Sequence, residues 1–323
     1  MQYEECGRLT RGVGGLYEIR LDAGATPLSG RTVASRAKGN FRTKGLSPLV
    51  GDRVRVLFDE VAVLRYEGEG ARADDGGGVV ITEILPRTSA IIRPPMANLG
   101  VLFITFAVKD PEPATETIDK LIAIAEYNGI EPVPVICKCD LAPERAAELK
   151  AMYQNAGFTA FSISSATRRG VEELKTWIGE HLGNRIAAFS GASGVGKSTL
   201  LNALYPDLKL QTGAISEKIA RGKHTTRRVE LYPIEDGYVA DTPGFSMLDF
   251  VRFDFFKKED LPFVMREFEP YIGSCRYTKC THTKEQGCAI LEAVREGRIA
   301  ESRHRGFLSM YEELRHKNEW SKK

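Results

Sequence analysis

Residues 191–198, Gly-Ala-Ser-Gly-Val-Gly-Lys-Ser, match the pattern G-x-x-x-x-G-K-[ST] of a phosphate-binding loop. They follow an expected apolar strand at 185–190 and open an expected helix at 199–204, the context in which such a loop binds phosphate. The glycines let backbone N–H groups surround the phosphates, Lys197 brings a cation to the β and γ oxygens, and the Ser198 hydroxyl can ligate Mg²⁺. We expect nucleotide contacts from Gly191, Ala192, Ser193, Gly194, Val195, Gly196, Lys197, Ser198 and Thr199.

A second motif, Asp-Thr-Pro-Gly at 241–244, follows an expected strand at 238–240. At this strand end the Asp241 carboxylate can hold the water shell of Mg²⁺, and Gly244 can donate its N–H to the γ-phosphate. Paired with the phosphate loop, the motif predicts a switch that senses the nucleotide. Lys197 and Gly244 would then be catalytic groups, because both meet the phosphate that reacts.

Two further strand ends carry residues similar to the guanine-recognition motifs N-K-x-D and S-A-x. They follow expected strands at 133–136 and 159–163. Asp140 would accept the two hydrogen bonds that only the Watson–Crick edge of guanine donates, and the Ala166 N–H would meet the guanine carbonyl. We expect base contacts from Cys137, Lys138, Asp140, Ser165 and Ala166. The alternative is that these residues form ordinary surface loops.

The order of these motifs differs from that of Ras-like GTPases, in which the phosphate loop comes first and the base-recognition motifs come last. Here residues 137–166 precede the phosphate loop. The same sheet can form if the usual chain ends are joined and the chain is reopened after Asp241. The expected helix at 171–178 runs into the strand of the phosphate loop through a short connector, as that joining requires. We therefore predict a circularly permuted P-loop GTPase.

The residue after the switch motif is unusual. Ras-like enzymes have a glutamine there that orients the attacking water, whereas this chain has Phe245, whose ring cannot hydrogen-bond a nucleophile. Intrinsic hydrolysis should therefore be slow. In the polar segment 222–226, Thr225 or Thr226 can ligate Mg²⁺, and His224 is our candidate to orient the water. The alternative is a histidine that contacts only RNA or solvent.

Three cysteines and a histidine lie within fourteen residues near the C-terminus: Cys275, Cys280, His282 and Cys288. Three thiolates and one imidazole complete a tetrahedral Zn²⁺ ligand set, with no open position for catalysis. We expect one structural zinc ion per chain. The alternative is a group of buried free cysteines beside a surface histidine.

The elements that position these residues fall into three regions, and the fold class is α/β. Residues 1–85 contain expected strands at 14–21, 31–37, 53–58, 61–66 and 79–84, typical of an OB-like β-barrel. Residues 86–250 alternate strands and amphipathic helices, with further strands expected at 101–106 and 227–232, and predict the permuted GTPase domain. Residues 251–323 show helical stretches at 289–295 and 299–316 and form a helical zinc-binding domain.

A basic cluster occupies the expected barrel. Residues 31–55 contain seven cations and one acid, Asp52. Small barrels bind RNA with cations on phosphates and an aromatic ring for stacking. We expect RNA contacts from Arg36, Lys38, Phe41, Arg42 and Lys44. The alternative is a solvated charged face.

The composition of the chain limits the classes of protein to which it can belong. The chain has 323 residues, 42% of them hydrophobic, and a net charge of +2, so a basic field over the whole molecule is excluded. The longest apolar run, 100–108, is half a membrane span, and the N-terminus lacks the pattern of a secretory signal. We therefore expect a cytoplasmic protein with no membrane partner.

The succession of β-barrel, permuted GTPase and Cys/His tail resembles the ribosome small subunit-dependent GTPases, the RsgA or YjeQ family. Besides the motifs above, the resemblance rests on Gly39-Asn-Phe-Arg42, Pro48-Leu-Val-Gly-Asp52, Pro86-Arg87 and Arg93-Pro94. It implies GTP hydrolysis stimulated by the small (30S) ribosomal subunit and a role in the late maturation of that subunit. The implied partners are GTP or GDP and the small subunit with its 16S rRNA, bound by a monomer. Cys137 stands where the family has asparagine, and the loss of that side chain's hydrogen bonds should cost about 1–3 kcal/mol of nucleotide affinity.

Two other functions remain as alternatives at this point. An RNA chaperone could use GTP only as a ligand that orders its structure, without significant turnover. A P-loop kinase acting on a small metabolite would need neither Asp140 nor a barrel that faces RNA.

Overall fold

The computed structural model describes residues 1–37, 41, 46–67, 78–91, 95–206, 208, 229–241 and 257–320. The chain forms two compact units. Unit 1 contains Met1–Gly100, Leu182–Ala188 and Leu210–Pro243, and unit 2 contains Val101–His181, Phe189–Lys209 and Gly244–Lys323. None of the helices among the described residues combines the length and the apolar character needed to cross a membrane.

Five strands of unit 1 close into a barrel. They are β1 (Gln2–Val13), β2 (Leu16–Leu21), β3 (Thr32–Ala37), β4 (Arg53–Asp59) and β5 (Val80–Ile84). β1 pairs with β2 and β4, β2 with β3, β3 with β5 and β5 with β4, so the pairing returns to its start. Only β3 and β5 are parallel. This closed arrangement of five strands, filled by side chains such as Leu9, Ile19 and Val54, confirms the predicted OB-like barrel.

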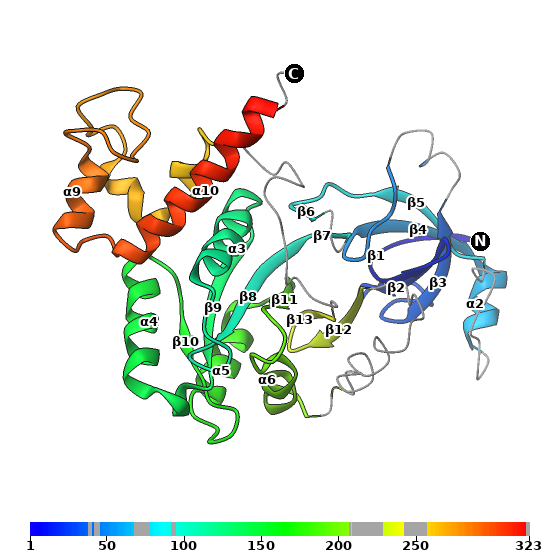
Figure 1. The fold of residues 1–323 in the computed structure, drawn as a ribbon. Coiled ribbons are helices and arrows are strands. Elements are labelled where there is room, and N and C mark those ends of the chain that lie inside the picture. The colour runs from blue at the N-terminus through cyan, green and yellow to red at the C-terminus, as the bar shows by residue number, and fades with distance from the viewer. Residues whose placement is uncertain are drawn as a thin grey trace. The chain divides into compact units, whose positions relative to one another are not determined.

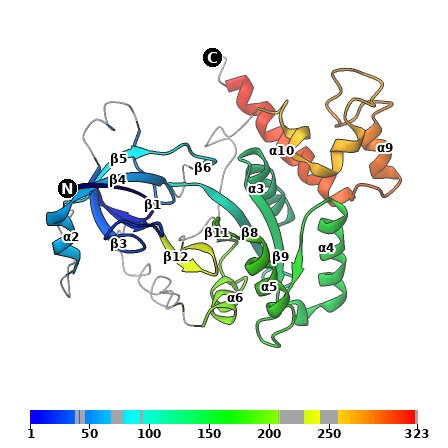
Figure 2. The same ribbon diagram turned by 180° about the vertical axis from the view of Figure 1, so that it is seen from behind.

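One element of the barrel region was predicted wrongly. Residues 61–66 form part of a helix, α2 (Glu60–Glu67), which lies at the side of the barrel (Figure 2), and are not a strand. The Asp59 carboxylate accepts a hydrogen bond from the Ala62 N–H at 2.9 Å, so it caps the helix. The helix buries Ala62, and the Tyr66 hydroxyl accepts a hydrogen bond from the Ala34 N–H at 2.7 Å. The N-terminal cap and the buried face thus stabilise a helix, although the β-branched residues of this segment favour a strand.

Unit 1 also contains a two-stranded ladder and three strands from later in the chain. The ladder consists of β6 (Ala90–Ile91) and β7 (Met96–Ala97). The later strands are β11 (Ile186–Ser190), of which residues 186–188 belong to unit 1, β12 (Glu230–Ile234) and β13 (Gly237–Asp241). β13 pairs parallel with β11 and antiparallel with β12, and β12 meets β1 at Arg11 and Glu230. The buried Asp52 carboxylate accepts two hydrogen bonds from Arg87, at 2.7 and 2.8 Å, which ties the chain after the barrel to the barrel itself.

Unit 2 has parallel strands with helices between them. Its strands β8 (Leu99–Ala107, which belongs to unit 2 from Val101 onward), β9 (Glu131–Cys137) and β10 (Phe161–Ser162) pair in parallel. The connecting helices are α3 (Thr115–Tyr127), the 3₁₀ turn η1 (Cys139–Leu141), α4 (Pro143–Asn155), α5 (Val171–His181) and α6 (Lys197–Leu204). β8 and β9 are almost wholly buried and apolar, as parallel strands covered on both faces must be. This confirms the predicted α/β class.

The C-terminal part of unit 2 is helical. It contains the 3₁₀ segments η2 (Leu261–Val264) and η3 (Arg266–Tyr271) and the helices α9 (Ala289–Arg295) and α10 (Glu301–Trp320). α10 lies along α3, as both ribbon views show (Figures 1 and 2). A Cβ at Gly306 would lie 2.1 Å from an oxygen of Asp119, so only glycine permits this approach of the two helices.

A buried ion cluster joins these helices. The Arg303 guanidinium of α10 donates to Asp119 of α3 at 2.5 Å and to Glu267 of η3 at 2.7 Å, and the exposed fraction of each of the three side chains is 4% or less. Burial outweighs the opposing effect of Arg303 and raises the pKa of the Asp119 carboxyl to about 6. One guanidinium is shared by two carboxylates, so the cluster carries one excess negative charge when both are ionised.

The first prediction concerns the pH dependence of stability. Because the pKa of Asp119 rises from 3.8 on folding, its contribution to the free energy of unfolding is fully present below about pH 4 and is lost as the pH rises through about 6. At about 1.4 kcal/mol per pKa unit, the loss is ~3 kcal/mol. Asp119→Asn removes the titrating group, so the stability of the wild type relative to the variant should fall between pH 4 and pH 7 in urea unfolding. A difference that stays constant over this range would contradict the prediction.

Candidate nucleotide and metal sites

The phosphate loop leaves the end of β11 and enters α6 directly. Gly191 and Gly196 have φ angles of +150° and +105°, conformations that side chains with a Cβ rarely adopt. The Lys197 ammonium folds over the loop and donates to the carbonyl oxygens of Gly191 at 2.5 Å and of Ala192 at 2.8 Å. Burial lowers the pKa of Lys197. The predicted residues 191–199 therefore form one loop and the first turn of a helix, with N–H groups and a cation that can bind phosphate.

Thr105 positions this loop and was missed by the sequence analysis. Its side chain is buried on β8, and its hydroxyl donates to the Ser190 carbonyl oxygen at 2.6 Å. A Cβ at Gly191 would lie 2.0 Å from the Thr105 carbonyl oxygen, so the first glycine of the loop packs directly on β8. One signal was present in the sequence, because Thr105 is the single hydroxyl-bearing residue in the apolar run 101–108.

The two predicted base-recognition segments meet at the ends of β9 and β10. Lys138 has a φ angle of +56°, which turns the chain from β9 into η1. The Cys139 N–H donates to the Ile163 carbonyl at 3.1 Å, and the Ile163 N–H donates to the Ile136 carbonyl at 2.7 Å. These bonds hold the loop that carries Asp140 against the segment that leads to Ser165 and Ala166. The side chain of Asp140 is exposed, as a group that binds a base must be before the nucleotide arrives.

Cys137 connects the base-recognition side to the phosphate loop. Its side chain is buried, and a Cβ at Gly196 would lie 3.9 Å from the Cβ of Cys137. Burial, with a smaller effect from Cys139, raises the pKa of the Cys137 thiol to about 12, so the group is a neutral thiol at physiological pH. The structure thus places the end of β9 against the phosphate loop, although the motifs are far apart in the chain.

The switch residues are only partly described. Asp241 is the last residue of β13, where its backbone pairs with Glu230, but its side chain lies outside the described residues. The predicted residues His224, Thr225, Thr226 and Gly244 also lie outside them, as does Phe245.

The four predicted metal ligands converge. The Nδ1 atom of His282 lies 3.6 Å from the sulfurs of both Cys275 and Cys288, these sulfurs are 3.8 Å apart, and all four donor atoms, including that of Cys280, lie within 4.8 Å of one another. With metal–sulfur bonds of about 2.3 Å and metal–nitrogen bonds of about 2.0–2.1 Å, the edges of a tetrahedron measure ~3.8 Å and ~3.6 Å. The donors therefore fit one tetrahedral metal ion.

The loop that carries His282 is held by a carboxylate. Glu285 accepts hydrogen bonds from the Thr281 N–H at 2.8 Å, from the Thr281 hydroxyl, and from the N–H groups of Thr283 and Lys284 at 3.1 Å each. Although burial opposes ionisation, these bonds lower the pKa of Glu285 to about 2. His304 of α10 contacts the His282 carbonyl oxygen at 2.9 Å. The ligand loop is thus fixed by its own bonds and by a contact with α10.

The proposed RNA-contact residues are mostly outside the described residues, as Lys38, Arg42 and Lys44 are. Arg36 is exposed on β3. The exposed fraction of Phe41 is only 7%, so its ring is not available to stack on a base, and that interpretation is wrong for this conformation. Its apolar ring is more stable packed in the interior than in water.

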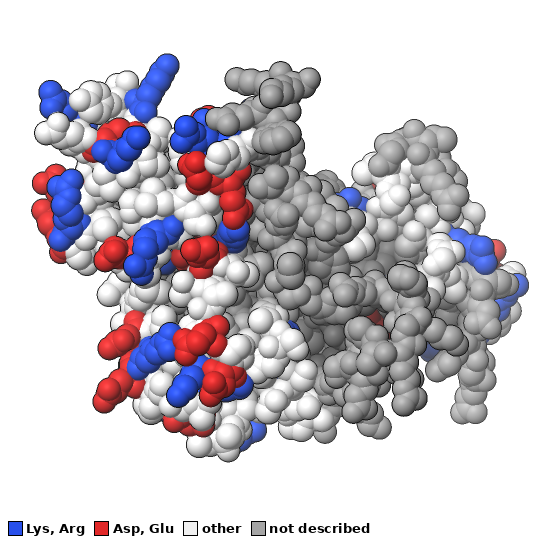
Figure 3. Space-filling model, viewed as in Figure 1, with Lys and Arg blue, Asp and Glu red and all other residues white. Residues whose placement is uncertain are grey.

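Two further cations of the basic cluster already have carboxylate partners. Arg53 pairs with Asp22 at 2.5 Å, and Arg55 pairs with Glu4 at 2.6 Å and Glu83 at 2.9 Å. On the face shown in Figure 3, lysines and arginines are interspersed with acids over unit 2. The count of cations in the sequence therefore overstates the charge that the barrel offers to RNA.

Comparison with known protein families assigns two regions of the chain. Residues 84–251 match the model of the RsgA GTPase, and residues 6–62 match the model of the RsgA N-terminal domain. The curated small ribosomal subunit biogenesis GTPase RsgA of Caldanaerobacter subterraneus subsp. tengcongensis is 39% identical over 313 residues, which cover 96% of this chain and 96% of the relative. The protein of the same name from Enterococcus faecalis is 36% identical over 321 residues, which cover 98% of each chain.

Two solved structures share the fold over nearly the whole chain. YloQ, described as a circularly permuted GTPase, has a TM-score of 0.75 and 28% identity, and the match covers 98% of this chain and 96% of that chain. YjeQ from Thermotoga maritima has a TM-score of 0.75 and 31% identity, with coverage of 97% and 99%. The fold and the nucleotide site therefore define a circularly permuted GTPase, as predicted. Within that class, the chain belongs to the RsgA family.

The second prediction concerns Cys137, which departs from the family's asparagine. A neutral thiol cannot make the bonds of an amide to the base and the phosphate loop, so Cys137→Asn should tighten GTP binding by at least about fivefold, or ~1 kcal/mol. Calorimetric titration with GTP measures the change. Cys6→Asn, the same substitution in the barrel, should leave the affinity as it is. An unchanged affinity in Cys137→Asn would show that the site has compensated for the missing amide.

Proposed function

We propose that this GTPase acts as a switch in the late maturation of the small ribosomal subunit, to which it binds in its GTP form and from which it departs after hydrolysis. The observation that carries the proposal is the placement of Cys137, at the end of the predicted base-recognition strand, beside Gly196 of the phosphate loop, where a Cβ would lie 3.9 Å from the Cβ of Cys137. This placement brings the predicted base-recognition side and the phosphate loop together into one candidate guanine-nucleotide site. The curated relatives of the chain are named for biogenesis of the small ribosomal subunit.

In this proposal the predicted motifs have separate roles on the nucleotide. Asp140 and Ala166 select guanine, and the loop 191–199 binds the phosphates with Lys197 on the β and γ oxygens. Ser198, Asp241 and one of Thr225 and Thr226 would hold Mg²⁺. When bound, that ion neutralises the charge that develops on the transferred phosphate. Selection of guanine distinguishes this site from that of a P-loop kinase for a small metabolite.

Hydrolysis needs a group that orients water, and Phe245 cannot supply it. Groups that orient the nucleophile or stabilise charge in such enzymes contribute up to about 10³–10⁵ in rate, or roughly 4–7 kcal/mol. We assign this role to His224, which would orient the attacking water when the small subunit is bound. Gly244 donates its N–H to the γ-phosphate, so nucleotide state and switch conformation are coupled.

The partner surfaces belong to the other regions. We propose domains at 1–85, 86–250 and 251–323, with the barrel contacting 16S rRNA through Arg36, Lys38, Arg42 and Lys44. The chain would act as a monomer in the cytoplasm, where subunits mature. The cluster of Cys275, Cys280, His282 and Cys288 would hold a structural zinc ion, because three thiolates and an imidazole at these separations are a typical Zn²⁺ ligand set.

The third prediction tests the function and the role of His224 together. Small subunits should stimulate GTP turnover, large subunits and free RNA should not, and His224→Ala should lose most of the stimulation while it retains GTP and subunit binding. Phosphate-release kinetics give the rates. His316→Ala, a control at an exposed histidine of α10, should behave as the wild type. No stimulation by small subunits would contradict the proposed function and favour the chaperone, and full stimulation in His224→Ala would move the catalytic group to the ribosome.

The fourth prediction concerns the metal. Freshly purified protein should contain about one equivalent of zinc, and less than about half an equivalent would contradict a four-ligand structural site. Chelation or Cys280→Ala should open the ligand loop between η3 and α9, because metal binding drives the folding of such loops. α10 should stay protected from hydrogen exchange, since its contacts with α3 do not involve the metal, and GTP binding should persist.

A further inference from the structure

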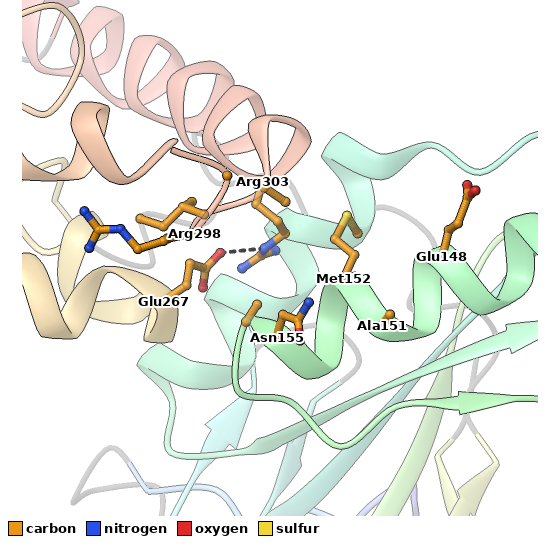
Figure 4. Close-up of a pocket in the computed structure, with 11 residues that line it drawn as sticks. Glu148, Ala151, Met152, Asn155, Glu267, Arg298 and Arg303 are labelled. Carbon is orange, nitrogen blue, oxygen red and sulfur yellow. Dashed lines mark hydrogen bonds and ion pairs between the residues drawn. The ribbon is translucent and has the colours of Figure 1, made fainter. Parts of the chain in front are cut away.

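A pocket of about 500 Å³ lies beside the C-terminal half of α4, and none of its lining residues is a predicted nucleotide or metal ligand (Figure 4). Met152 and Asn155 of α4 form one wall. The opposite wall comes from Glu267 of η3, Arg298 in the α9–α10 connection and Arg303 of α10. All of these elements belong to unit 2.

The charges around the pocket do not balance. The Arg303 guanidinium is shared between Asp119 and Glu267, so two carboxylates face one cation. Oε1 of Glu267 accepts the bond from Arg303, whereas Oε2 is buried and has no hydrogen-bond partner among the described residues. The Glu267 side chain is 96% buried, and a buried carboxylate oxygen without a donor is costly.

The other cation of the lining does not compensate for this charge. Arg298 donates to Glu296 at 2.7 Å and lies over the ring of Tyr271, with its guanidinium carbon 5.0 Å from the ring centroid. A further carboxylate, Glu148, lines the α4 side. The C-terminal end of α4 adds partial negative charge from its backbone dipoles. The pocket therefore favours a positively charged ligand that donates hydrogen bonds.

The remaining walls are apolar. Ala151 and Met152 on one side and Ile299 and Ala300 on the other bring methyl and methylene groups to the pocket. Such walls suit a short aliphatic chain, which buries its methylenes while its charged end meets a polar group. Apolar walls together with an unsatisfied carboxylate are complementary to a protonated amine on an alkyl chain.

We propose that this pocket binds an alkylammonium group, either a free polyamine or the lysine side chain of a protein partner. The ammonium supplies the positive charge that the cluster of Arg303, Asp119 and Glu267 lacks. A rotation of the Glu267 carboxylate toward the pocket gives Oε2 the missing donor. The site is distinct from the nucleotide site and does not depend on the proposed function.

Methyl NMR of protein labelled at its methionines tests the proposal, because Met152 lies in the pocket wall. The probe is 1,5-diaminopentane, and 1,5-pentanediol is the matched uncharged probe. The Met152 resonance should shift to saturation with the diamine at millimolar concentrations and should not saturate with the diol. Titrations with two further probes then distinguish the two sources of the ammonium group. Spermidine represents a free polyamine, and N-acetyl-lysine methylamide represents a lysine side chain of a protein. The probe that matches the true source should bind more tightly than the other.

Two variants give the proposal a structural control. Ala151→Leu puts a bulkier side chain into the pocket wall and should weaken diamine binding at least about tenfold. Glu267→Gln, which keeps an acceptor for Arg303, should weaken it similarly. Ala147→Leu is the same change on an exposed position of α4 outside the lining, and should bind as the wild type does. Hydrogen-exchange protection of α10 reports that the C-terminal part of each variant is folded. No saturation up to about 20 mM diamine, equal binding of the diol, or undiminished binding in Ala151→Leu would overturn the proposal.

Discussion

The contact between β8 and the first glycine of the phosphate loop fixes where the nucleotide site forms. The Thr105 hydroxyl bonds to the carbonyl oxygen of Ser190, and Gly191 approaches β8 so closely that a Cβ would lie 2.0 Å from a backbone oxygen. β8 pairs in parallel with β9, so the carboxyl end of β9 and the predicted base-recognition residues there meet the same edge as the loop. Parallel pairing thus assembles the site regardless of the order in which the motifs occur along the chain.

The helical C-terminal part depends on a different interaction. Arg303 is buried with Asp119 and Glu267, and Gly306 lets α10 approach α3. Removing one member of such a cluster leaves a buried charge without a partner, which costs far more than an exposed ion pair contributes. α3 therefore holds α10, which in turn contacts the metal-ligand loop through His304.

Local motifs were predictable from the sequence, whereas long-range packing was not. The strand before the phosphate loop and α9 were placed within a residue, because apolar runs and loop chemistry are local signals. β1 was missed because the alternation of polar and apolar residues does not indicate a strand there. It is a strand because it pairs with neighbouring strands on both sides. α4 was missed because only Ala146 and Tyr153 are buried in it. No local pattern could reveal that Arg303 meets Asp119, 184 residues away.

In the proposed function, the bound nucleotide controls binding of the protein to the small subunit. The most direct test measures the affinity of the full chain for purified small subunits, once with a non-hydrolysable GTP analogue and once with GDP. The account predicts that binding with the analogue is at least about tenfold tighter, which corresponds to a coupling of ~1.4 kcal/mol between the two sites. Equal affinities in the two nucleotide states would contradict it.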